Sequence, residues 1–590
     1  MNNRILILLL LLLLVCNVHA QYVTTNTELT NAINAATAGS TITLKNQTWT
    51  NVQISINKNG NLANPITIKA ETPGNVFFEG VTNVKMGGGY IYFEGVVFQN
   101  PPASVSTGTP LIDFRASSTD CNNCKVTNIK IDAFNQGASQ QTSVFKWVLL
   151  RGANNEVSYS SFVGKHGVGS IINDNRDSSN PNYHKIHHNF FANRTPQGTS
   201  AVNADNDQDA IRIGSSSTSL SNSFTEVYDN YFYNFSGEIE VISNKSGSNK
   251  YYNNTFENYQ GALTLRHGNN CEVYNNFFLA NSNPFSGGVR VMGENHKIYN
   301  NYIEGVRSRY ENGSLSNGVG GINIANGRTD GVLNGYLPVK NLTIVNNTFV
   351  NCDYGIRIGT AFNSTQSVAP DNVIIGNNII FLDAVIPNAS SNRAIQVVTQ
   401  LTGTSSKYEN NMKQTGNWDS FGAVTATGNI DVISGLLASG SDFYRIPASS
   451  DAIDYGVGSY SFLTQDILGG NRETAFDAGA EEYGAAGTKG PYKLVDVGVK
   501  VGFGASGTLS ISEKVKAPSN IKVYPVPTKD ELTVSSLNKT IGTIEIFDIT
   551  GKLLLKTTNN SNMLKVNVSS FLKGIYILKA DDFKSRFVIE

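Results

Sequence analysis

Two glutamates stand two residues apart near the middle of the chain, at Glu238 and Glu240. On a β-strand such a pair points to one face, where two negative charges are costly unless a cation lies between them. Carboxylate oxygens are the ligands that a hard ion such as Ca2+ prefers, and Asn206 offers a neutral amide oxygen further upstream. The pair therefore suits a calcium site, although taken alone it is more typical of a solvated strand face.

Basic residues follow the glutamates at regular distances. Lys245 lies seven residues after Glu238, Arg266 follows 21 residues later, and Arg290 follows after a further 24. If one coil of the fold takes 21 to 24 residues, Arg266 and Arg290 stack on adjacent rungs of one face. Each of these residues alone is typical of solvated surface charge, but a face that combines a metal, a lysine and stacked arginines would bind a polyanion.

An internal sequence repeat indicates which fold would position these residues. A β-branched or aromatic residue, an Asn pair or its equivalent, and two further residues that are mostly apolar recur along the chain. The second Asn of each repeat is Asn189, Asn230, Asn254, Asn276, Asn301, Asn347 and Asn378. Three of the intervals are 22 to 25 residues long, and the longer ones fit two coils or one coil with an inserted loop.

A period in the low twenties with short strands predicts a right-handed parallel β-helix with about three strands in each coil. Asn tolerates the left-handed backbone conformation that such turns need, and stacked Asn side chains can hydrogen-bond from coil to coil. A leucine-rich repeat would need regular Leu positions, and a propeller blade takes about 40 residues or more. We therefore predict an all-β fold class, a parallel β-helix followed by a small β-sandwich-like C-terminal domain.

Composition supports this fold and excludes other classes of protein. The 590 residues have a formal net charge of −1 and only 15% charged residues, with no basic block, which argues against nucleic-acid binding. The 29 Phe and 25 Tyr exclude a disordered chain. The 72 Asn and 55 Gly disfavour long helices and favour strands joined by tight turns.

The N-terminus has the features of an export signal. Arg4 precedes an apolar run at residues 5–15 that is too short to span a membrane, and a small-residue cleavage site ends the predicted signal peptide of residues 1–20. The alternative, a lipoprotein signal at Cys16, has a poor lipobox. No later segment is long and apolar enough to span a membrane, so we expect an exported, soluble protein that is monomeric by default.

Four cysteines remain after the signal peptide. In an oxidising compartment, Cys121 and Cys124 could form a local disulfide. A zinc site would need a second Cys or His pair at matching spacing, which the sequence lacks. We expect Cys271 and Cys352 to be buried as small apolar residues.

The segments that precede and follow the repeat differ from it in sequence. Apolar residues at i, i+3, i+4 and i+7 from Leu29 predict a short amphipathic helix that caps the solenoid. Repeat character fades near residue 440, and residues 475–484 resemble the closing segment of many β-helix enzymes. Residues 485–518 are rich in Gly, Ser and Lys, as expected for a linker.

Residues 519–590 read as a separate small all-β domain, with strand-like runs between turns. The segment resembles the C-terminal sorting domain of the type IX secretion system in YPVP at 524–527, DITGK at 548–552 and GIYILK at 574–579. Val526 replaces the Asn that is usual in the first motif. The resemblance implies a secreted or cell-surface protein with the type IX secretion machinery as a partner. The alternative is a carbohydrate-binding or linker-like β domain.

Residues 21–484 resemble polysaccharide lyase family 6, which contains alginate lyases and dermatan-type chondroitin lyases on a right-handed parallel β-helix. The matching stretches are Asn206 ahead of AIRIG at 210–214, GEIEVISNKS at 237–246, LRHGN at 265–269 and GVRVMGE at 288–294. Their order and spacing agree as well as their residues. One departure is Asp207-Gln208-Asp209, where family members more often carry Gly-Gly-Glu.

The family resemblance assigns Ca2+ to Asn206, Glu238 and Glu240, the base to Lys245 and the acid to Arg266, and we expect His267 and Arg290 to bind substrate. Breaking a 4-linked uronic acid by β-elimination requires removal of the C5 proton, which lies α to a carboxylate. Ca2+ on that carboxylate would neutralise its charge. Lys245 must be unprotonated while it acts, a state that neighbouring cations favour.

These residues predict a secreted, calcium-dependent alginate lyase that takes an anionic polysaccharide and leaves an unsaturated uronate end. The nearest alternative is a lyase of the same fold that acts on a glycosaminoglycan. A glycan hydrolase would need two carboxylates separated by a sugar, whereas Glu238 and Glu240 nearly touch. A non-catalytic surface adhesin would keep its function after replacement of Lys245.

Overall fold

A computed structural model describes residues 20–198, 200–201, 203–204, 206–383, 386, 392–500, 521–536, 540–548, 552–558, 560–580 and 583–589. The chain separates into two compact units, divided between residues 507 and 508. The predicted signal peptide up to residue 19, residues 501–518 of the predicted linker and the turn at 549–551 lie outside the described residues. In the described part of the chain, no helix is long and apolar enough to cross a membrane.

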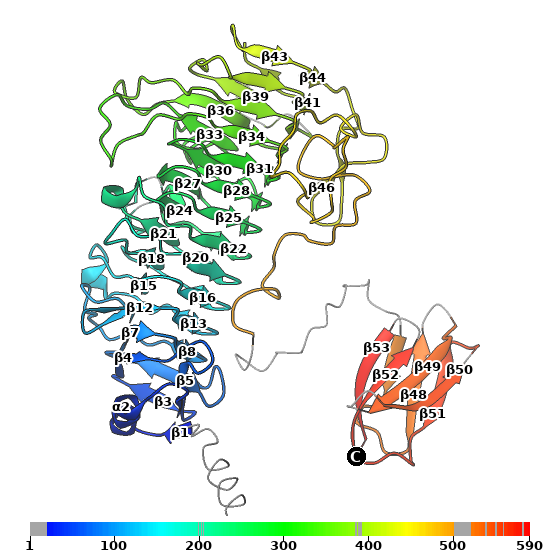
Figure 1. Cartoon of the computed structure of the whole chain (residues 1–590). Coiled ribbons are helices and arrows are strands. Elements are labelled where there is room, and N and C mark those ends of the chain that lie inside the picture. Colours follow the sequence, from blue (N-terminus) through cyan, green and yellow to red (C-terminus); the bar gives the residue numbers. More distant parts are fainter. Residues whose placement is uncertain are drawn as a thin grey trace, which may run out of the picture. The chain divides into compact units, whose positions relative to one another are not determined.

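The first unit is a solenoid of three long parallel sheets with 15, 15 and 14 strands (Figure 1). One coil contributes β24 (Glu240–Lys245), β25 (Lys250–Tyr252) and β26 (Thr255–Glu257), one strand to each sheet. The chain then returns to the first of these sheets as β27 (Gly261–His267), which pairs with β24 in parallel. This topology confirms the predicted parallel β-helix.

We name the sheets by their strands. Sheet A runs from β1 (Ala20–Val23) to β43 (Thr425–Thr427), and sheet B runs from β3 (Thr48–Thr50) to β44 (Ile430–Asp431). Sheet C contains, in spatial order, β11 (Arg115–Ala116), β12 (Thr119–Asn122), β7 (Asn83–Gly89), β10 (Ile112–Asp113), β15 (Val148–Leu150), β18 (Ile172–Asp174), β21 (Ile211–Gly214), β24, β27, β30 (Ser286–Val291), β33 (Ile322–Ala325), β36 (Tyr354–Thr360), β39 (Arg393–Val397) and β42 (Asn417–Trp418). Its remaining strand, β4 (Gln53–Asn59), also pairs with β7.

The repeated Asn pairs lie at the turn between sheets A and B, and the two members of a pair do different things. The first position is left-handed in every repeat, for example at Asn253 with φ 55° and Asn300 with φ 52°. The second Asn belongs to a buried ladder in which each Nδ2 donates to the Oδ1 of the next Asn at 2.8–3.1 Å. The ladder runs through Asn189, Asn230, Asn254, Asn276, Asn301, Asn347, Asn378, Asn411 and Asn429. Both predicted roles of Asn are confirmed, and the long intervals are single coils with inserted loops.

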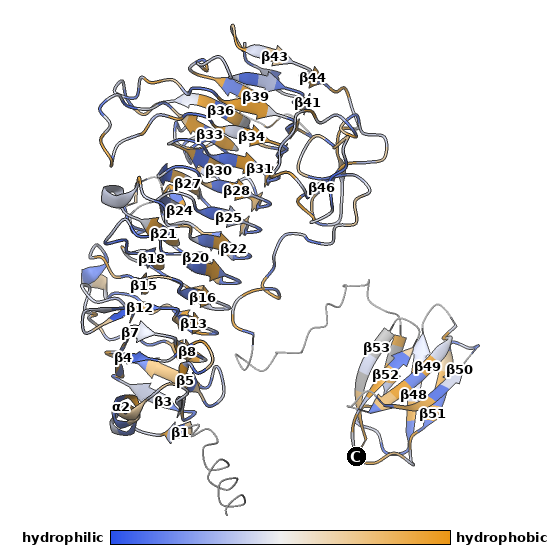
Figure 2. Ribbon diagram, viewed as in Figure 1, coloured by the Kyte–Doolittle hydropathy of each residue, from blue (hydrophilic) through white to orange (hydrophobic). Residues whose placement is uncertain are grey.

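Apolar side chains fill the interior of the solenoid, where equivalent residues of neighbouring coils stack on one another. Phe191, Phe232, Phe256 and Phe278 stack with ring centroids 4.5–4.7 Å apart. On β26 (Thr255–Glu257), Thr255 and Glu257 flank the buried Phe256 and point to the other face. Hydrophobic and hydrophilic segments accordingly lie side by side along the solenoid in Figure 2. The alternation follows from the two-residue period of a strand.

The predicted N-terminal cap is present. Helix α2 (Asn26–Ala35) buries Leu29 and Ile33 against the first coils. The hydroxyl of Thr25 accepts a hydrogen bond from the Glu28 N–H at 3.2 Å, as expected of a residue that begins a helix.

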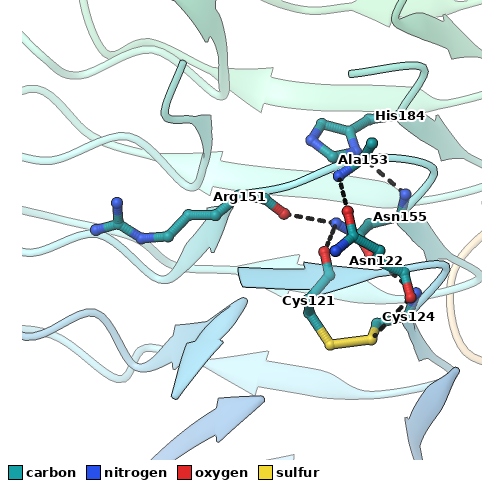
Figure 3. The surroundings of a disulfide bond; sticks show 7 residues. All are labelled: Cys121, Asn122, Cys124, Arg151, Ala153, Asn155 and His184. Atoms are coloured by element: carbon teal, nitrogen blue, oxygen red, sulfur yellow. Dashed lines mark hydrogen bonds between the residues drawn. A yellow bond between two sulfur atoms is a disulfide. The ribbon is translucent and has the colours of Figure 1, made fainter. Parts of the chain in front are cut away.

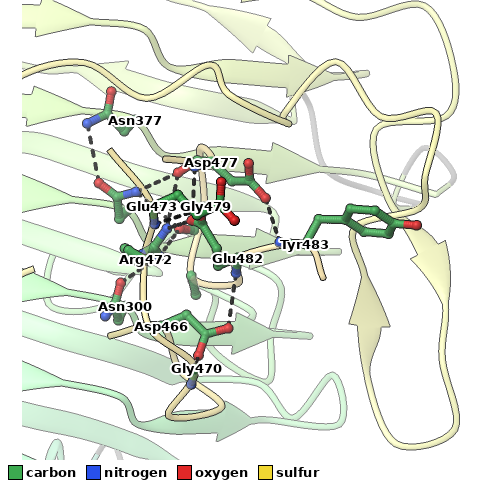
Figure 4. A network of polar contacts seen from close by, with 12 residues as sticks. Asn300, Asn377, Asp466, Gly470, Arg472, Glu473, Asp477, Gly479, Glu482 and Tyr483 are labelled. Atoms are coloured by element: carbon green, nitrogen blue, oxygen red, sulfur yellow. Dashed lines mark hydrogen bonds and ion pairs between the residues drawn. The ribbon is translucent and has the colours of Figure 1, made fainter. Parts of the chain in front are cut away.

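The predicted closing segment lies beside the coils rather than across their end. Residues 444–500, which we call the strap, follow the turns that carry the left-handed Asn residues. The Asn346 Nδ2 donates to the Asp477 carbonyl at 2.9 Å, and Asn377 Nδ2 donates to the Val457 carbonyl at 2.9 Å. Arg472 joins the two parts, because it donates to Asn300 of the solenoid and to Glu482 of the strap (Figure 4).

The first part of the predicted linker continues this packing. The Tyr492 N–H donates to the Thr255 hydroxyl at 2.7 Å, the Gly498 N–H to the His188 carbonyl at 2.8 Å, and the Lys500 N–H to the Asn128 side chain at 3.1 Å. Residues 485–500 are therefore held against the solenoid, in contrast to the free linker that composition suggested. The reason is that their backbone donors find fixed acceptors at successive turns.

A disulfide joins Cys121 and Cys124 (Figure 3). Asn155 of the next coil brackets it, because its Nδ2 donates to the Cys121 carbonyl at 2.8 Å and its Oδ1 accepts from the Cys124 N–H at 2.8 Å. His184 of the following coil accepts from the Asn155 N–H. The other described cysteines, Cys271 and Cys352, are free and buried as predicted.

The second unit is a small all-β domain, as predicted. Its strands are β47 (Ile521–Tyr524), β48 (Glu531–Ser536) and β51 (Met563–Asn567) in one antiparallel sheet, and β50 (Leu553–Thr558), β49 (Thr543–Asp548), β52 (Gly574–Ala580) and β53 (Phe583–Ile589) in another. Both sheets contribute to one apolar core, with Leu532 and Val534 from the first and Ile546 and Leu578 from the second.

Candidate active site

One cleft of about 520 Å³ brings together every residue predicted for the site. These are Asn206, Glu238, Glu240, Lys245, Arg266, His267 and Arg290. The floor of the cleft is sheet C at β24, β27 and β30, and its walls include the loop that precedes β21 and the loop that follows β33. Loops on a rigid solenoid can therefore shape a site while the strands fix its floor.

The two glutamates line the same cleft and both are buried, but only Glu240 lies on a strand, because β24 begins there and Glu238 is in the bend that precedes it. The Glu238 Oε1 accepts a hydrogen bond from the Gln208 N–H at 2.8 Å. Burial, together with the charges of Asp209 and Glu240, raises the pKa of Glu238. Glu240 accepts from Arg290 Nη1 at 3.4 Å and from the Ser243 hydroxyl. The negative charges of this corner are thus crowded and only partly compensated.

The donor set fits a hard cation in its chemistry. Glu238 and Glu240 offer carboxylate oxygens, and Asn206 lines the same cleft with an amide oxygen. Burial and the neighbouring charges of Asp209 and Glu240 raise the pKa of Glu238, and a divalent cation would relieve the repulsion between these carboxylates. Over the described residues, no three His, Cys, Asp or Glu side chains are arranged to hold a metal. A cation here would therefore depend on the Asn206 amide, and on water or substrate oxygens, to complete its shell.

Lys245 and Arg266 stand on neighbouring strands of the floor. In the pairing of β24 with β27, Asn244 faces Leu265 and Lys245 faces His267. Arg266 is therefore the extra residue of a β-bulge, a feature that re-aims side chains and is common beside active sites. Chiefly because it is buried, Arg266 has a lowered pKa, an effect that Glu240 opposes.

Arg266 and Arg290 both point into the cleft from sheet C, but they are not opposite each other in the pairing of their strands. The pairing of β27 with β30 places Thr264, not Arg266, opposite Arg290. The predicted direct stacking of the two arginines is therefore off by two residues: the paired residues Thr264 and Arg290 lie 26 positions apart, not 24, and β30 has an extra residue in this pairing. Both guanidinium groups still meet, at the ring of Tyr336, with Cζ 4.4 Å and 5.5 Å from its centroid.

His267 is a buried and neutral imidazole. Burial, Arg266 and Lys245 lower its pKa to about 3. Among the described residues, its Nδ1 is buried without a hydrogen-bond partner. His267 lines the cleft, and the substrate-binding role that we expect of it stays a prediction.

Several residues of the cleft were not identified from the sequence. Tyr336 and Asn334 come from the loop inserted between Asn301 and Asn347, and the only signal for that loop was the long interval itself. Arg212 also lines the cleft, and its guanidinium pairs with Asp209 at 2.7 Å and with Asp207. The unusual Asp207-Gln208-Asp209 segment thus neutralises a cation of the cleft.

Comparison with known proteins places this site in a family. The family model described as Chondroitinase B matches residues 23–429, and the model described as secretion system C-terminal sorting domain matches residues 522–589. A sorting domain of this kind directs the protein to the outside of the cell. The chain also matches an endo-acting ulvan lyase of Formosa agariphila, 28% identical over 76 residues, but only across 13% of the chain and 15% of that lyase.

Solved structures show the same architecture. The chain is similar to the family 6 alginate lyase AlyGC, with a TM-score of 0.63 and 29% identity, over 76% of this chain and 60% of that one. A mannuronic acid specific family 6 lyase from human gut microbiota has a TM-score of 0.57 and 24% identity, over 71% of this chain and 92% of that one, a likeness of fold. Since the Chondroitinase B match covers more than half of the residues, the chain belongs to the Chondroitinase B family, polysaccharide lyase family 6, and it carries a C-terminal secretion sorting domain.

Proposed function

We propose that this exported polysaccharide lyase is an alginate lyase that cleaves 4-linked uronic acid chains by β-elimination. The observation that carries the proposal is the cleft itself, which holds a carboxylate pair, a lysine and two arginines on one floor. The likeness to AlyGC, an alginate lyase at 29% identity, supports alginate as the substrate.

In this reaction Lys245 is the base. Its neutral amine takes the proton from C5 of the uronate, the electron pair forms the C4–C5 double bond, and the C4–O4 bond breaks. Lys245 lies at the end of β24 opposite His267. The base is held on a strand of the floor, so its position is set by the sheet.

Arg266 is placed to act on the leaving oxygen. Burial lowers its pKa, which makes the guanidinium a better proton donor to O4 than an exposed arginine. Arg290 and His267 line the same floor and would bind the carboxylates or hydroxyls of the chain. Asn206, Glu238 and Glu240 would hold Ca2+, which when bound neutralises the carboxylate of the reacting sugar.

The nearest alternative is a lyase that acts on a glycosaminoglycan, which the Chondroitinase B family match keeps open. A hydrolase is disfavoured, because it needs two carboxylates with a sugar and water between them, and Glu238 and Glu240 share one corner of the cleft. A non-catalytic adhesin would not need a half-buried lysine and a half-buried arginine together at the floor of one cleft. Export would proceed through the type IX secretion machinery, which the sorting domain would engage.

One experiment separates these functions. The protein is incubated with polymannuronate, polyguluronate, mixed alginate and dermatan sulfate, with and without a chelator, and ultraviolet absorbance of the unsaturated product is followed. We expect absorbance to rise with at least one alginate and to stop after chelation. A rise with dermatan sulfate alone would move the proposal to the alternative. Release of saturated reducing ends without absorbance would identify a hydrolase.

A further inference from the structure

A loop far from Arg266 in the sequence holds this arginine in place. The loop spans residues 326–338, between β33 and β34 (Thr343–Val345). The Arg266 Nη2 donates to the Asn334 carbonyl at 3.0 Å, and its Nη1 donates to the Gly335 carbonyl. The Tyr336 ring covers the guanidinium with its centroid 4.4 Å from Cζ. The two carbonyls bind the guanidinium in its plane and the ring covers one face of it. Together these contacts fix the orientation of the guanidinium.

The same tyrosine also fixes Arg290. The Arg290 Nη2 donates to the Tyr336 hydroxyl at 2.8 Å. On the other side, Arg290 Nη1 donates to Glu240 Oε1 at 3.4 Å, and Arg266 Nε lies 3.9 Å from that same oxygen. Tyr336 therefore touches both arginines opposite the carboxylate that they share. One side chain sets the distance between two cations that would otherwise repel each other.

The loop is itself anchored. The Arg328 N–H donates to the Tyr336 carbonyl at 2.7 Å. Gly327 and Val368 exchange two backbone hydrogen bonds of 2.8 Å and 2.9 Å, which ties the loop to its neighbour on the next coil. The Tyr336 ring also packs against Phe362 of that second loop, with centroids 6.0 Å apart. These contacts hold Tyr336 in the wall of the cleft.

We propose that Tyr336 is a positioning residue for the elimination, in which its ring orients Arg266 and its hydroxyl orients Arg290. This inference rests on the proposed function, since it assigns Arg266 to the leaving oxygen and Arg290 to substrate. Misplacement of a reacting group by about 1 Å can cost a hundredfold in rate. Loss of the Tyr336 hydroxyl should therefore affect mainly the binding of substrate through Arg290, and loss of the ring should also affect the rate through Arg266.

Two substitutions separate the two contacts. Tyr336→Phe removes the hydroxyl and keeps the ring, so we expect KM to rise about fivefold with kcat within about twofold of wild type. Tyr336→Leu removes both, so we expect kcat to fall at least about tenfold as well. Tyr233→Leu, at an exposed tyrosine on β23 (Tyr231–Phe235) of sheet B, is the matched control and should leave both constants unchanged. A loss of fold would instead lower the active fraction in all variants of Tyr336 without splitting kcat from KM.

Crystal structures provide a readout that does not depend on activity. In Tyr336→Leu we expect the Arg266 guanidinium to leave the carbonyls of Asn334 and Gly335, and in Tyr336→Phe we expect it to stay. Wild-type kcat in Tyr336→Leu, or Arg266 unmoved in its structure, would overturn the inference. If the wild type cleaves none of the polymers, the proposed function fails, and the structures still decide whether Tyr336 positions the arginines.

Discussion

Lys245 faces His267, and not Arg266, where β24 pairs with β27. The bulge that causes this offset leaves Arg266 between two residues that have partners, Leu265 and His267. The base and the acid proposed for the reaction therefore come from adjacent strands at different positions along the cleft floor. Since they act on C5–H and on O4 of one sugar, such an offset is what an elimination requires.

Replacement of Lys245 by Ala should reduce kcat by about 10² to 10⁴, the usual contribution of a general base. The fold should not change, because the side chain lies at the cleft floor and not in the core. Initial rates from ultraviolet absorbance measure the effect, and circular dichroism checks the fold. Lys185→Ala is the matched control, since Lys185 is exposed on β19 (Lys185–His187) of sheet A. A loss of less than about tenfold in Lys245→Ala would contradict the role of base.

Glu238→Gln should separate calcium binding from stability. Burial and nearby carboxylates raise the pKa of Glu238, so removal of its charge should leave the Tm of the calcium-free protein unchanged or higher. Calcium at 100 times its Kd should stabilise the wild type by about 2.7 kcal/mol and stabilise the variant much less. Calorimetric titration and thermal unfolding measure both effects. An equal calcium-dependent shift of Tm in both proteins would show that Glu238 is no ligand.

His296 should make the solenoid sensitive to acid. Its Nδ1 accepts from the Cys271 N–H at 3.1 Å and its Nε2 lies 3.0 Å from the Met292 carbonyl, an arrangement that suits only the neutral ring. Burial lowers its pKa from 6.5 to about 4. Stability from this residue is complete above pH 6.5 and is lost as the pH falls toward 4, by up to about 3 kcal/mol.

His296→Asn tests this dependence, because Asn249 fills a similar place by accepting from the Thr225 N–H at 2.8 Å. Unfolding in urea at a series of pH values gives the free energy. Between pH 6.5 and 4, the variant should lose less stability than the wild type. Parallel curves for the two proteins would remove His296 from the acid response.

The two members of an Asn pair should differ in their sensitivity to substitution. Asn276→Ala removes an acceptor used by the Asn254 N–H and side chain, and a donor to Asn301. Each buried group left without a partner costs about 1–3 kcal/mol. Asn275→Gly should change stability little, since Asn275 has φ 55° and glycine adopts that conformation freely. Urea unfolding compares the two, and equal losses would mean that the ladder adds no stability of its own.

The parts of the molecule that repeat were predictable from the sequence. A left-handed turn and an amide ladder restrict two adjacent positions in every coil, so Asn pairs such as Asn275 and Asn276 mark the turns directly. The meeting of Glu238 and Glu240 in one cleft was predicted, although Glu238 lies in the bend before β24 and not on a strand. The contact of Arg266 with Tyr336 did not, because it joins a bulge to an aperiodic loop and neither has a local signal.

The strap ends its described course at Lys500, beside Asn128, and not beside the last coils at β43 and β44. Within its described course, the strap runs from the turn at Asn377, toward the C-terminal end of the solenoid, back to the turn at Asn128. Between these points, Tyr492 and Gly498 donate hydrogen bonds to Thr255 and His188, so one continuous segment contacts coils that are far apart in the sequence. Separation of these coils along the solenoid would also have to break the hydrogen bonds of the strap, so the strap braces the β-helix along its length.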